Sequence, residues 1–236
     1  MNKVVGLDRA SGRDLLGSGG GLAAERFRRR LLGGLDFGPG RGRWALDVGC
    51  GDGLEAVELV RRGWKVEAVD LEAHPCWASL RSTYRGSIRF RVASDKDLGR
   101  FQSSYALVFQ KDVLHHVTEP LSLLKTLARL TAPGGELWML ECNRRNPVSY
   151  VHLTLLQGHQ HFTMGRFRAL ATAAGLDGAI FWTREARVWP TESAVFQDAV
   201  DRLQDALGAL PFWRHFAVYN LARWRRPARR AAGSRV

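Results

Sequence analysis

A glycine-rich segment near residue 50 is the part of the chain best suited to hold a ligand. Residues 46–53 read Leu-Asp-Val-Gly-Cys-Gly-Asp-Gly, an apolar run that ends in alternating glycines. Glycines between a strand and a helix let the backbone approach a ligand closely and direct the helix's free N–H groups toward it. Asp70 stands where the next strand would end, and its carboxylate could accept hydrogen bonds from ribose hydroxyls. The pattern predicts a site for a nucleoside cofactor.

The spacing of this turn indicates which class of nucleoside to expect. Dinucleotide-binding turns read G-x-G-x-x-G and rest a pyrophosphate on the helix N-terminus. Residues 49–53 read G-x-G-x-G instead, with Asp47 before them and Asp52 among them. Two carboxylates repel a pyrophosphate and attract an ammonium or sulfonium group. A dinucleotide such as NAD is therefore disfavoured.

Four motifs, in order along the chain, resemble those of the class I, Rossmann-like S-adenosylmethionine-dependent methyltransferase family. Residues 47–53 match its D-x-G-x-G-x-G turn, and Asp70 matches its ribose-binding acid. Residues 94–98 are similar to its adenine-side loop, residues 110–117 to its segment after the fourth strand, and residues 130–137 to its L-K-P-G-G turn. The resemblance covers roughly residues 43–183 and the final strand. The ordered set is more specific than any single motif.

The resemblance implies S-adenosylmethionine as the cofactor and assigns residues to each part of it. These are Asp47, Gly49, Cys50 and Gly51 at the methionine end, Asp70 and Leu71 at the ribose, Asp95 and Lys96 at the adenine, Gln110 beneath the cofactor and His115 beside it.

Two of these assignments have competing interpretations. Asp95 falls where the chain reads Ala-Ser-Asp and the family commonly reads G-D-A, so the alignment can shift by one residue either way. Asp95 also fits a solvated loop acid or a helix cap. Cys50 also fits a small space-filling residue.

Histidines are the candidate catalytic bases. Imidazole titrates near neutral pH, so His115, His159 or His161 could take a proton from a hydroxyl acceptor, whereas His116 fits a packing or capping role. The spacing of His159 and His161 also suits a metal pair. No third ligand stands nearby in the sequence, and Thr163 explains the local pattern as a helix N-cap, so no metal is expected.

Polar residues follow the fifth apolar run, at residues 141–146. Open α/β sheets bind ligands beyond the carboxyl ends of their strands. Glu141 and Asn143 could therefore face the methyl acceptor. Arg144 and Arg145 fit either solvated side chains or partners of an acidic acceptor.

Short apolar runs alternate with longer amphipathic stretches, as in successive βαβ units. We expect an α/β fold: a Rossmann-like, seven-stranded, mostly parallel sheet sandwiched by helices, with the last strand antiparallel. A tight turn is expected at residues 133–135. Strands are expected at residues 44–48, 65–69, 88–92, 105–109, 136–141, 179–183 and 216–222, and helices at residues 20–35, 54–62, 75–84, 120–131, 164–174 and 193–207.

These elements divide the chain into a basic helical extension (residues 1–42), a methyltransferase domain (43–225) and a basic flexible tail (226–236). A helical insertion at residues 184–215 is expected to contribute to the acceptor pocket. The formal net charge is +12, and its excess is confined to the ends, since residues 44–213 carry nineteen basic and nineteen acidic side chains.

Three functions are compatible with this pattern. The favoured one is methylation of an oxygen, nitrogen or carbon atom of a small molecule in a biosynthetic pathway. The alternatives are an RNA methyltransferase that uses the basic ends and a non-catalytic binding protein that retains the fold. Three unpaired cysteines, and no apolar run long enough to span a bilayer, favour a cytoplasmic protein without a membrane partner.

Overall fold

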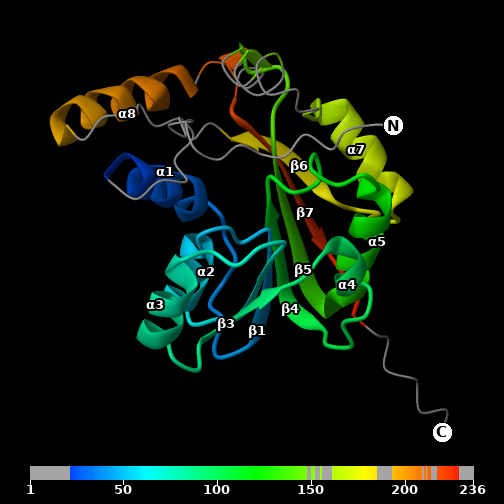
Figure 1. Cartoon of the computed structure of the whole chain (residues 1–236). Helices are drawn as coiled ribbons and strands as arrows, with labels where there is room; N and C mark the ends of the chain where they lie inside the picture. Colours follow the sequence, from blue (N-terminus) through cyan, green and yellow to red (C-terminus); the bar gives the residue numbers. More distant parts are fainter. Residues whose placement is uncertain are drawn as a thin grey trace, which may run out of the picture.

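The computed structural model describes residues 22–147, 150, 151, 155, 161–184, 193–208, 210, 212, 213 and 217–228. Its centre is a seven-stranded sheet with the order β3-β2-β1-β4-β5-β7-β6 (Figure 1). The strands are β1 (Trp44–Val48), β2 (Lys65–Asp70), β3 (Ile88–Val92), β4 (Tyr105–Lys111), β5 (Thr131–Cys142), β6 (Ile180–Arg184) and β7 (Tyr219–Arg225).

Only the last strand runs against its neighbours. β7 pairs antiparallel with both β5 and β6, whereas β1 to β5 pair in parallel. The mostly parallel sheet with an antiparallel last strand is therefore confirmed. From β1 the chain builds the sheet outward through β2 and β3, and β4 then pairs with the other edge of β1. Such a reversal of strand order creates a crevice at the carboxyl ends of β1 and β4.

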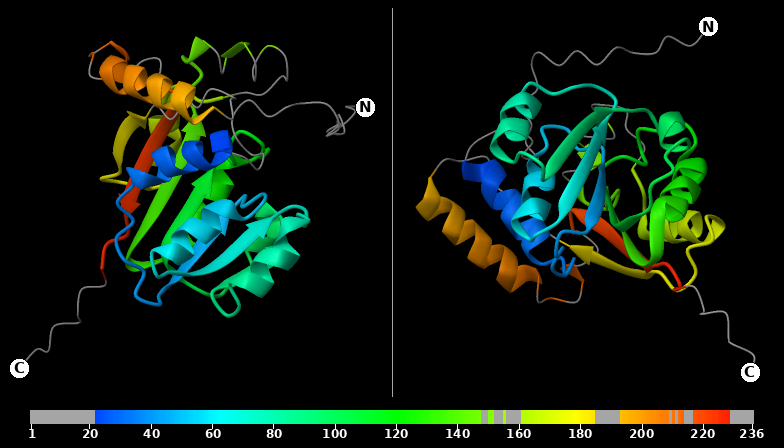
Figure 2. Two further views of the ribbon diagram at one scale, coloured as in Figure 1. Left: turned by 90° about the vertical axis from the view of Figure 1, so that its left-hand side faces the viewer. Right: turned by 90° about the horizontal axis from the view of Figure 1, so that it is seen from below.

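Helices cover both faces of the sheet. In Figures 1 and 2, α1, α2 and α3 lie on one face and α4, α5 and α7 on the other, and each face has its own buried apolar cluster. The helices are α1 (Leu22–Gly33), α2 (Leu54–Arg61), α3 (Cys76–Thr83), α4 (Asp95–Leu98), α5 (Pro120–Leu130), α7 (Met164–Ala173) and α8 (Ala194–Gly208). Among the described residues, no helix is long and apolar enough to cross a membrane.

The last and the fifth strands differ most from the sequence prediction. The last strand was expected at residues 216–222 but spans Tyr219–Arg225. It accommodates Arg223 because the guanidinium pairs with Glu136 on β5 and stacks over Trp138. The fifth strand begins at Thr131 instead of Glu136, and the expected turn forms an irregularity inside the strand, where Gly134 has a φ of +77°.

The N-terminal helix α1 is joined to α8 by ion pairs. Arg26 of α1 forms an ion pair with Asp198 of α8, and Arg30 lies 2.7 Å from Asp205 and 3.7 Å from Asp201. Figure 1 shows α1 between α8 and α2. These arginines belong to the basic N-terminal excess, so part of that excess is used within the fold.

Gly40 gives a direct test of how this N-terminal segment joins the domain. A Cβ at this position would lie 2.3 Å from the backbone nitrogen of Trp64, a contact that only backbone movement can relieve. We expect Gly40→Ala to lower the free energy of unfolding by about 3 kcal/mol, measured by urea denaturation. Gly165→Ala is the control, because that glycine lies in α7 and its added Cβ meets nothing within 4 Å. An equal loss in both variants would contradict the packing described here.

Candidate functional site

The glycine turn after β1 is open on one side and fixed by Asp70 on the other. Gly49, Gly51 and Gly53 have φ values of +74°, +50° and +85°, a region that favours glycine. The Asp70 carboxylate accepts hydrogen bonds from the backbone N–H groups of Gly51 and Leu71, both at 2.7 Å. A Cβ added to Gly51 would meet nothing within 4 Å. The turn therefore presents bare backbone and a partly exposed carboxylate to an open space.

Two polar side chains beneath the turn are buried without satisfying all their polar atoms. Oδ2 of Asp47 and Nε2 of Gln110 have no hydrogen-bond partner among the described residues. Burial raises the pKa of Asp47 well above its ordinary value, and nearby carboxylates raise it further. A buried unsatisfied polar atom costs about 1–3 kcal/mol. Unsatisfied atoms of this kind beneath a glycine turn fit a ligand that carries a positive charge and hydrogen-bonding groups.

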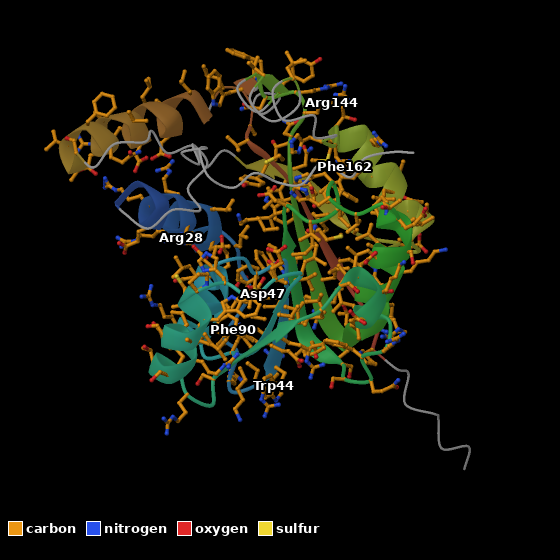
Figure 3. All side chains as sticks on the ribbon, in the orientation of Figure 1. Arg28, Trp44, Asp47, Phe90, Arg144 and Phe162 are labelled. Carbon is orange, nitrogen blue, oxygen red and sulfur yellow. The ribbon has the colours of Figure 1, made fainter. Side chains whose placement is uncertain are left out.

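An arginine from α1 reaches the same turn. Nη1 of Arg28 lies 4.0 Å from Oδ2 of Asp52, and each side chain is only 13% exposed. Figure 3 labels Arg28 on α1 and Asp47 below it in the sheet. Arg28 therefore brings a guanidinium to a turn that otherwise carries carboxylates, and a ligand with both charges would fit there.

Lys111, the last residue of β4, and Asp112, which follows it, form an ionic network next to the turn. Nζ of Lys111 lies 3.4 Å from Glu55 of α2 and 3.5 Å from Oδ2 of Asp112, and the hydroxyl of Tyr219 donates to the same oxygen at 2.8 Å. Burial alone would raise the pKa of Asp112, but Lys111, His115 and Tyr219 outweigh it and hold that pKa below its ordinary value. The network keeps a carboxylate ionised inside the protein.

Asp112 also has a strained backbone. Its φ is +57°, in the left-handed region that side chains other than glycine adopt at a cost of about 1 kcal/mol. Strained residues of this kind persist where the surrounding structure holds them and are common at functional sites. Here the contacts of the Asp112 side chain with Lys111 and Tyr219 keep the strained backbone in place.

Glu141, at the carboxyl end of β5, binds the loop after β4 from the other side. Its Oε1 accepts the backbone N–H groups of Val113 and Leu114, at 3.1 and 2.8 Å. Its Oε2 lies 2.7 Å from Nδ1 of His115. Burial alone would lower the pKa of His115, but the hydrogen bond and charge of Glu141, with the charge of Asp112, raise it above its ordinary value. The protonation of His115 is therefore coupled to Glu141.

Two further histidines surround this pair. The His115 ring centroid lies 4.0 Å from that of His116 and 4.4 Å from that of His161. His161 is 1% exposed and immediately precedes Phe162, whose backbone bridges to Asn143. Residues far apart in the sequence thus meet beyond the carboxyl ends of β4 and β5.

Among the described residues, Asp112, His115 and Glu141 bring ligand atoms within 4.8 Å of one another. A divalent cation there would compete with the Lys111 ammonium for Asp112. It would also compete with the hydrogen bond between His115 and Glu141. These contacts favour a network of protein charges over a metal centre.

Comparisons with known proteins identify the domain. A model of the methyltransferase domain family matches residues 46–139, which contain the glycine turn, Asp70 and the loop after β4. The segment from β1 into β5 is therefore similar to the methyltransferase domain family. The fold of this domain also agrees with a solved S-adenosylmethionine-dependent methyltransferase from Mesorhizobium loti, which has a TM-score of 0.57 at 19% identity and of which 97% is covered, against 86% of this chain.

A curated relative with a named activity matches the same part of the chain. The chain is 36% identical over 134 residues to a ubiquinone biosynthesis O-methyltransferase from Alkalilimnicola ehrlichii, covering 53% of this chain and 50% of the relative. The chain thus spans about half the length of such relatives. A solved structure of the [4+2]-cyclase SpnF has the same fold, with a TM-score of 0.61 at 17% identity, 87% of this chain and 82% of that chain being covered. Fold alone therefore does not fix the reaction.

The structure brings together most of the site residues expected from the sequence. Asp47, Gly49, Gly51, Asp70 and Gln110 surround one turn, and His115 lies beside His161.

The remaining candidates vary in position. Cys50 contributes only backbone, because its side chain packs in the apolar core. The side chain of Leu71 is 65% exposed. Asp95 and Lys96 form the first turn of α4, whose cap is Ser94, with Asp97 completing the capping box. The interpretation of Asp95 as the cap is therefore wrong. His159 lies outside the described residues.

Four residues of the site were missed. Lys111 and Asp112 stand inside the motif after the fourth strand, and two charges at the end of an apolar strand were the available signal. Arg28 gave no distinguishing signal among its neighbouring arginines. Tyr219 was assigned to the last strand, but nothing in the sequence indicated its hydrogen bond to Asp112.

Proposed function

We propose that the protein is an S-adenosylmethionine-dependent O-methyltransferase that acts on a hydroxyl group of a small molecule. The proposal rests chiefly on two buried atoms without a hydrogen-bond partner among the described residues, Oδ2 of Asp47 and Nε2 of Gln110. They lie under the glycine turn, whose Gly51 N–H donates to Asp70. The O-methyltransferase relative supports the choice of acceptor atom.

The residues around the turn fit each part of this cofactor. Asp47 would compensate the ammonium of the methionine end, and Arg28 would compensate its carboxylate. The lone pairs of Asp70 that do not face Gly51 and Leu71 would accept hydrogen bonds from the ribose hydroxyls. S-adenosylmethionine supplies a methyl group on a sulfonium, and transfer requires that acceptor, methyl and sulfur be held in line.

His115 is the best-supported base for a hydroxyl acceptor. Its Nδ1 is committed to Glu141, which leaves Nε2 as the atom that takes the proton. Only 4% of the His115 side chain is exposed. A buried base hydrogen-bonded to a carboxylate works where bulk water is excluded, as methyl transfer requires.

The basic ends give less support to an RNA acceptor. Besides Arg26 and Arg30, Arg223 pairs with Glu136, and Arg226 donates to the carbonyls of Arg129 and Thr131. Arginines held in this way have fewer donors to offer to phosphates.

The test is release of S-adenosylhomocysteine from S-adenosylmethionine, with a panel of mono- and dihydroxybenzoates as acceptors and matched amines as controls. We expect release with at least one hydroxylated acceptor, and an unchanged rate in the presence of EDTA. Cofactor binding without transfer to any acceptor class would favour a non-catalytic or cyclase-like role. Loss of activity with EDTA would point to a metal at Asp112, His115 and Glu141.

A further inference from the structure

Gly51 is the residue of the glycine turn that packing holds least. Its φ is +50°, and a Cβ added there would meet nothing within 4 Å. Glycine also has the widest choice of backbone conformations, so packing alone does not select the one seen here. The N–H of Gly51 donates to Oδ2 of Asp70 at 2.7 Å. This bond fixes the peptide group that precedes the Cα atom of Gly51.

The peptide group that follows Gly51 is fixed by a tryptophan. The indole N–H of Trp77 donates to the carbonyl oxygen of Gly51 at 2.8 Å. Trp77 is the second residue of α3, and only 4% of it is exposed. Asp70 ends β2 and Trp77 follows seven residues later in the sequence. One short stretch of chain therefore orients both peptide groups around Gly51.

The indole is itself held by an aromatic stack. The ring of Trp77 lies 4.9 Å from the ring of Phe90 on β3, with an angle of 15° between the planes. Phe90 also packs against Gly53, since a Cβ added to that glycine would lie 2.7 Å from Cε1 of the ring. The two stacked rings thus support the turn at Gly51 and at Gly53.

The bond from Trp77 also determines where the turn directs one of its N–H donors. No cis peptide bond occurs among the described residues. In a planar trans peptide group the C=O and N–H bonds point in opposite directions. The carbonyl of Gly51 points to the indole, so the N–H of Asp52 in the same peptide group points away from it. Loss of the indole bond would leave this peptide group free to rotate.

We propose that Trp77 is a positioning residue for the cofactor: by fixing the carbonyl of Gly51, it holds the turn in the conformation that binds S-adenosylmethionine. The inference rests on the proposed function, which places the cofactor on this turn. A turn that is ordered before the cofactor arrives loses less conformational freedom on binding, and the affinity rises accordingly.

The test is Trp77→Phe, which keeps an aromatic ring against Phe90 and removes the N–H donor. The turn should then adopt the binding conformation only part of the time, and the apparent Kd rises by the inverse of that fraction. We expect the Kd for S-adenosylmethionine to rise about fivefold, measured by isothermal titration calorimetry. The upper limit is about tenfold, because the net contribution of one hydrogen bond to an equilibrium is no larger.

Trp224→Phe is the matched control. The indole N–H of Trp224 donates to the carbonyl of Asp177, before β6, at 3.1 Å, and only 7% of Trp224 is exposed. The control therefore loses the same kind of bond at a site away from the turn. Its Kd should stay within twofold of the wild type, even if urea denaturation shows that both variants lose stability.

A Kd for Trp77→Phe within twofold of the wild type would overturn the proposal. An equal weakening in Trp224→Phe would also overturn it, because the effect would then come from general destabilisation. If Trp77→Phe does not fold, Trp77→Tyr, which also lacks the indole N–H, is held to the same limits. Absence of binding by the wild type would overturn the proposed function as well, whereas binding by the wild type with an unchanged variant counts only against the role of Trp77.

Discussion

Asp70→Ala is expected to weaken S-adenosylmethionine binding by about 10²- to 10⁴-fold. The carboxylate would make two hydrogen bonds to the ribose, and bonds to a charged group contribute about 1.5–3 kcal/mol each, while 1.4 kcal/mol corresponds to tenfold in Kd. Asp70 also fixes the N–H groups of Gly51 and Leu71, so its loss loosens the turn itself. Isothermal titration calorimetry measures the change.

Glu72→Ala is the matched control for this variant. Glu72 is an exposed acid in the same loop, and its removal should change the Kd by less than twofold. If Asp70→Ala binds as tightly as the wild type while retaining its melting temperature, the cofactor does not use this turn.

His115→Asn is expected to lower kcat by about 10²- to 10⁴-fold, the range typical of a lost general base. Asparagine keeps a hydrogen bond to Glu141 but cannot take up a proton. The Kd for S-adenosylmethionine should stay within twofold, because His115 acts on the acceptor. Steady-state kinetics with the best acceptor from the panel, together with calorimetry, check both values.

His116→Asn is the control for the histidine cluster, because His116 is exposed and the role expected for it is packing or capping. We expect less than a threefold loss of kcat. A small effect of His115→Asn would instead direct attention to His161, whose ring lies 4.4 Å away.

The direction of the pH dependence follows from the raised pKa of His115. A base must be neutral to act, so kcat/KM should rise with pH through a value above the ordinary histidine pKa of about 6.5, and this limb should be absent in His115→Asn. The linkage to stability has the opposite sign. The contribution of protonated His115 to folding is fully present below its unfolded pKa and is lost as pH rises through its folded pKa.

The glycine turn and the sheet could be predicted because their signals are local. Three alternating glycines after an apolar run indicate a tight turn, because glycine readily adopts the positive φ values that the turn requires. The strands β1 and β3 and the start of β4 fall where the apolar residues do. The last strand could not be placed as well. Its C-terminal half contains Arg223 and Arg225, and only the contact of Arg223 with Glu136 on another strand explains why a charged residue fits there.

The chemistry of the site was less predictable for the same reason. His115 was recognised as a candidate base, but its pairing with Glu141 joins residues 26 positions apart in the sequence. The bond between Asp112 and Tyr219 spans 107 positions. Sequence spacing identifies the residue types at the ends of strands, whereas the sheet order decides which of them meet.

The most direct test is calorimetric titration of the full chain with S-adenosylmethionine, with NAD as the comparison ligand. We expect saturable one-site binding of S-adenosylmethionine, none of NAD, and competition by S-adenosylhomocysteine. Absence of S-adenosylmethionine binding by folded protein, with and without hydroxylated acceptors present, would contradict a methyl-transfer function for this domain.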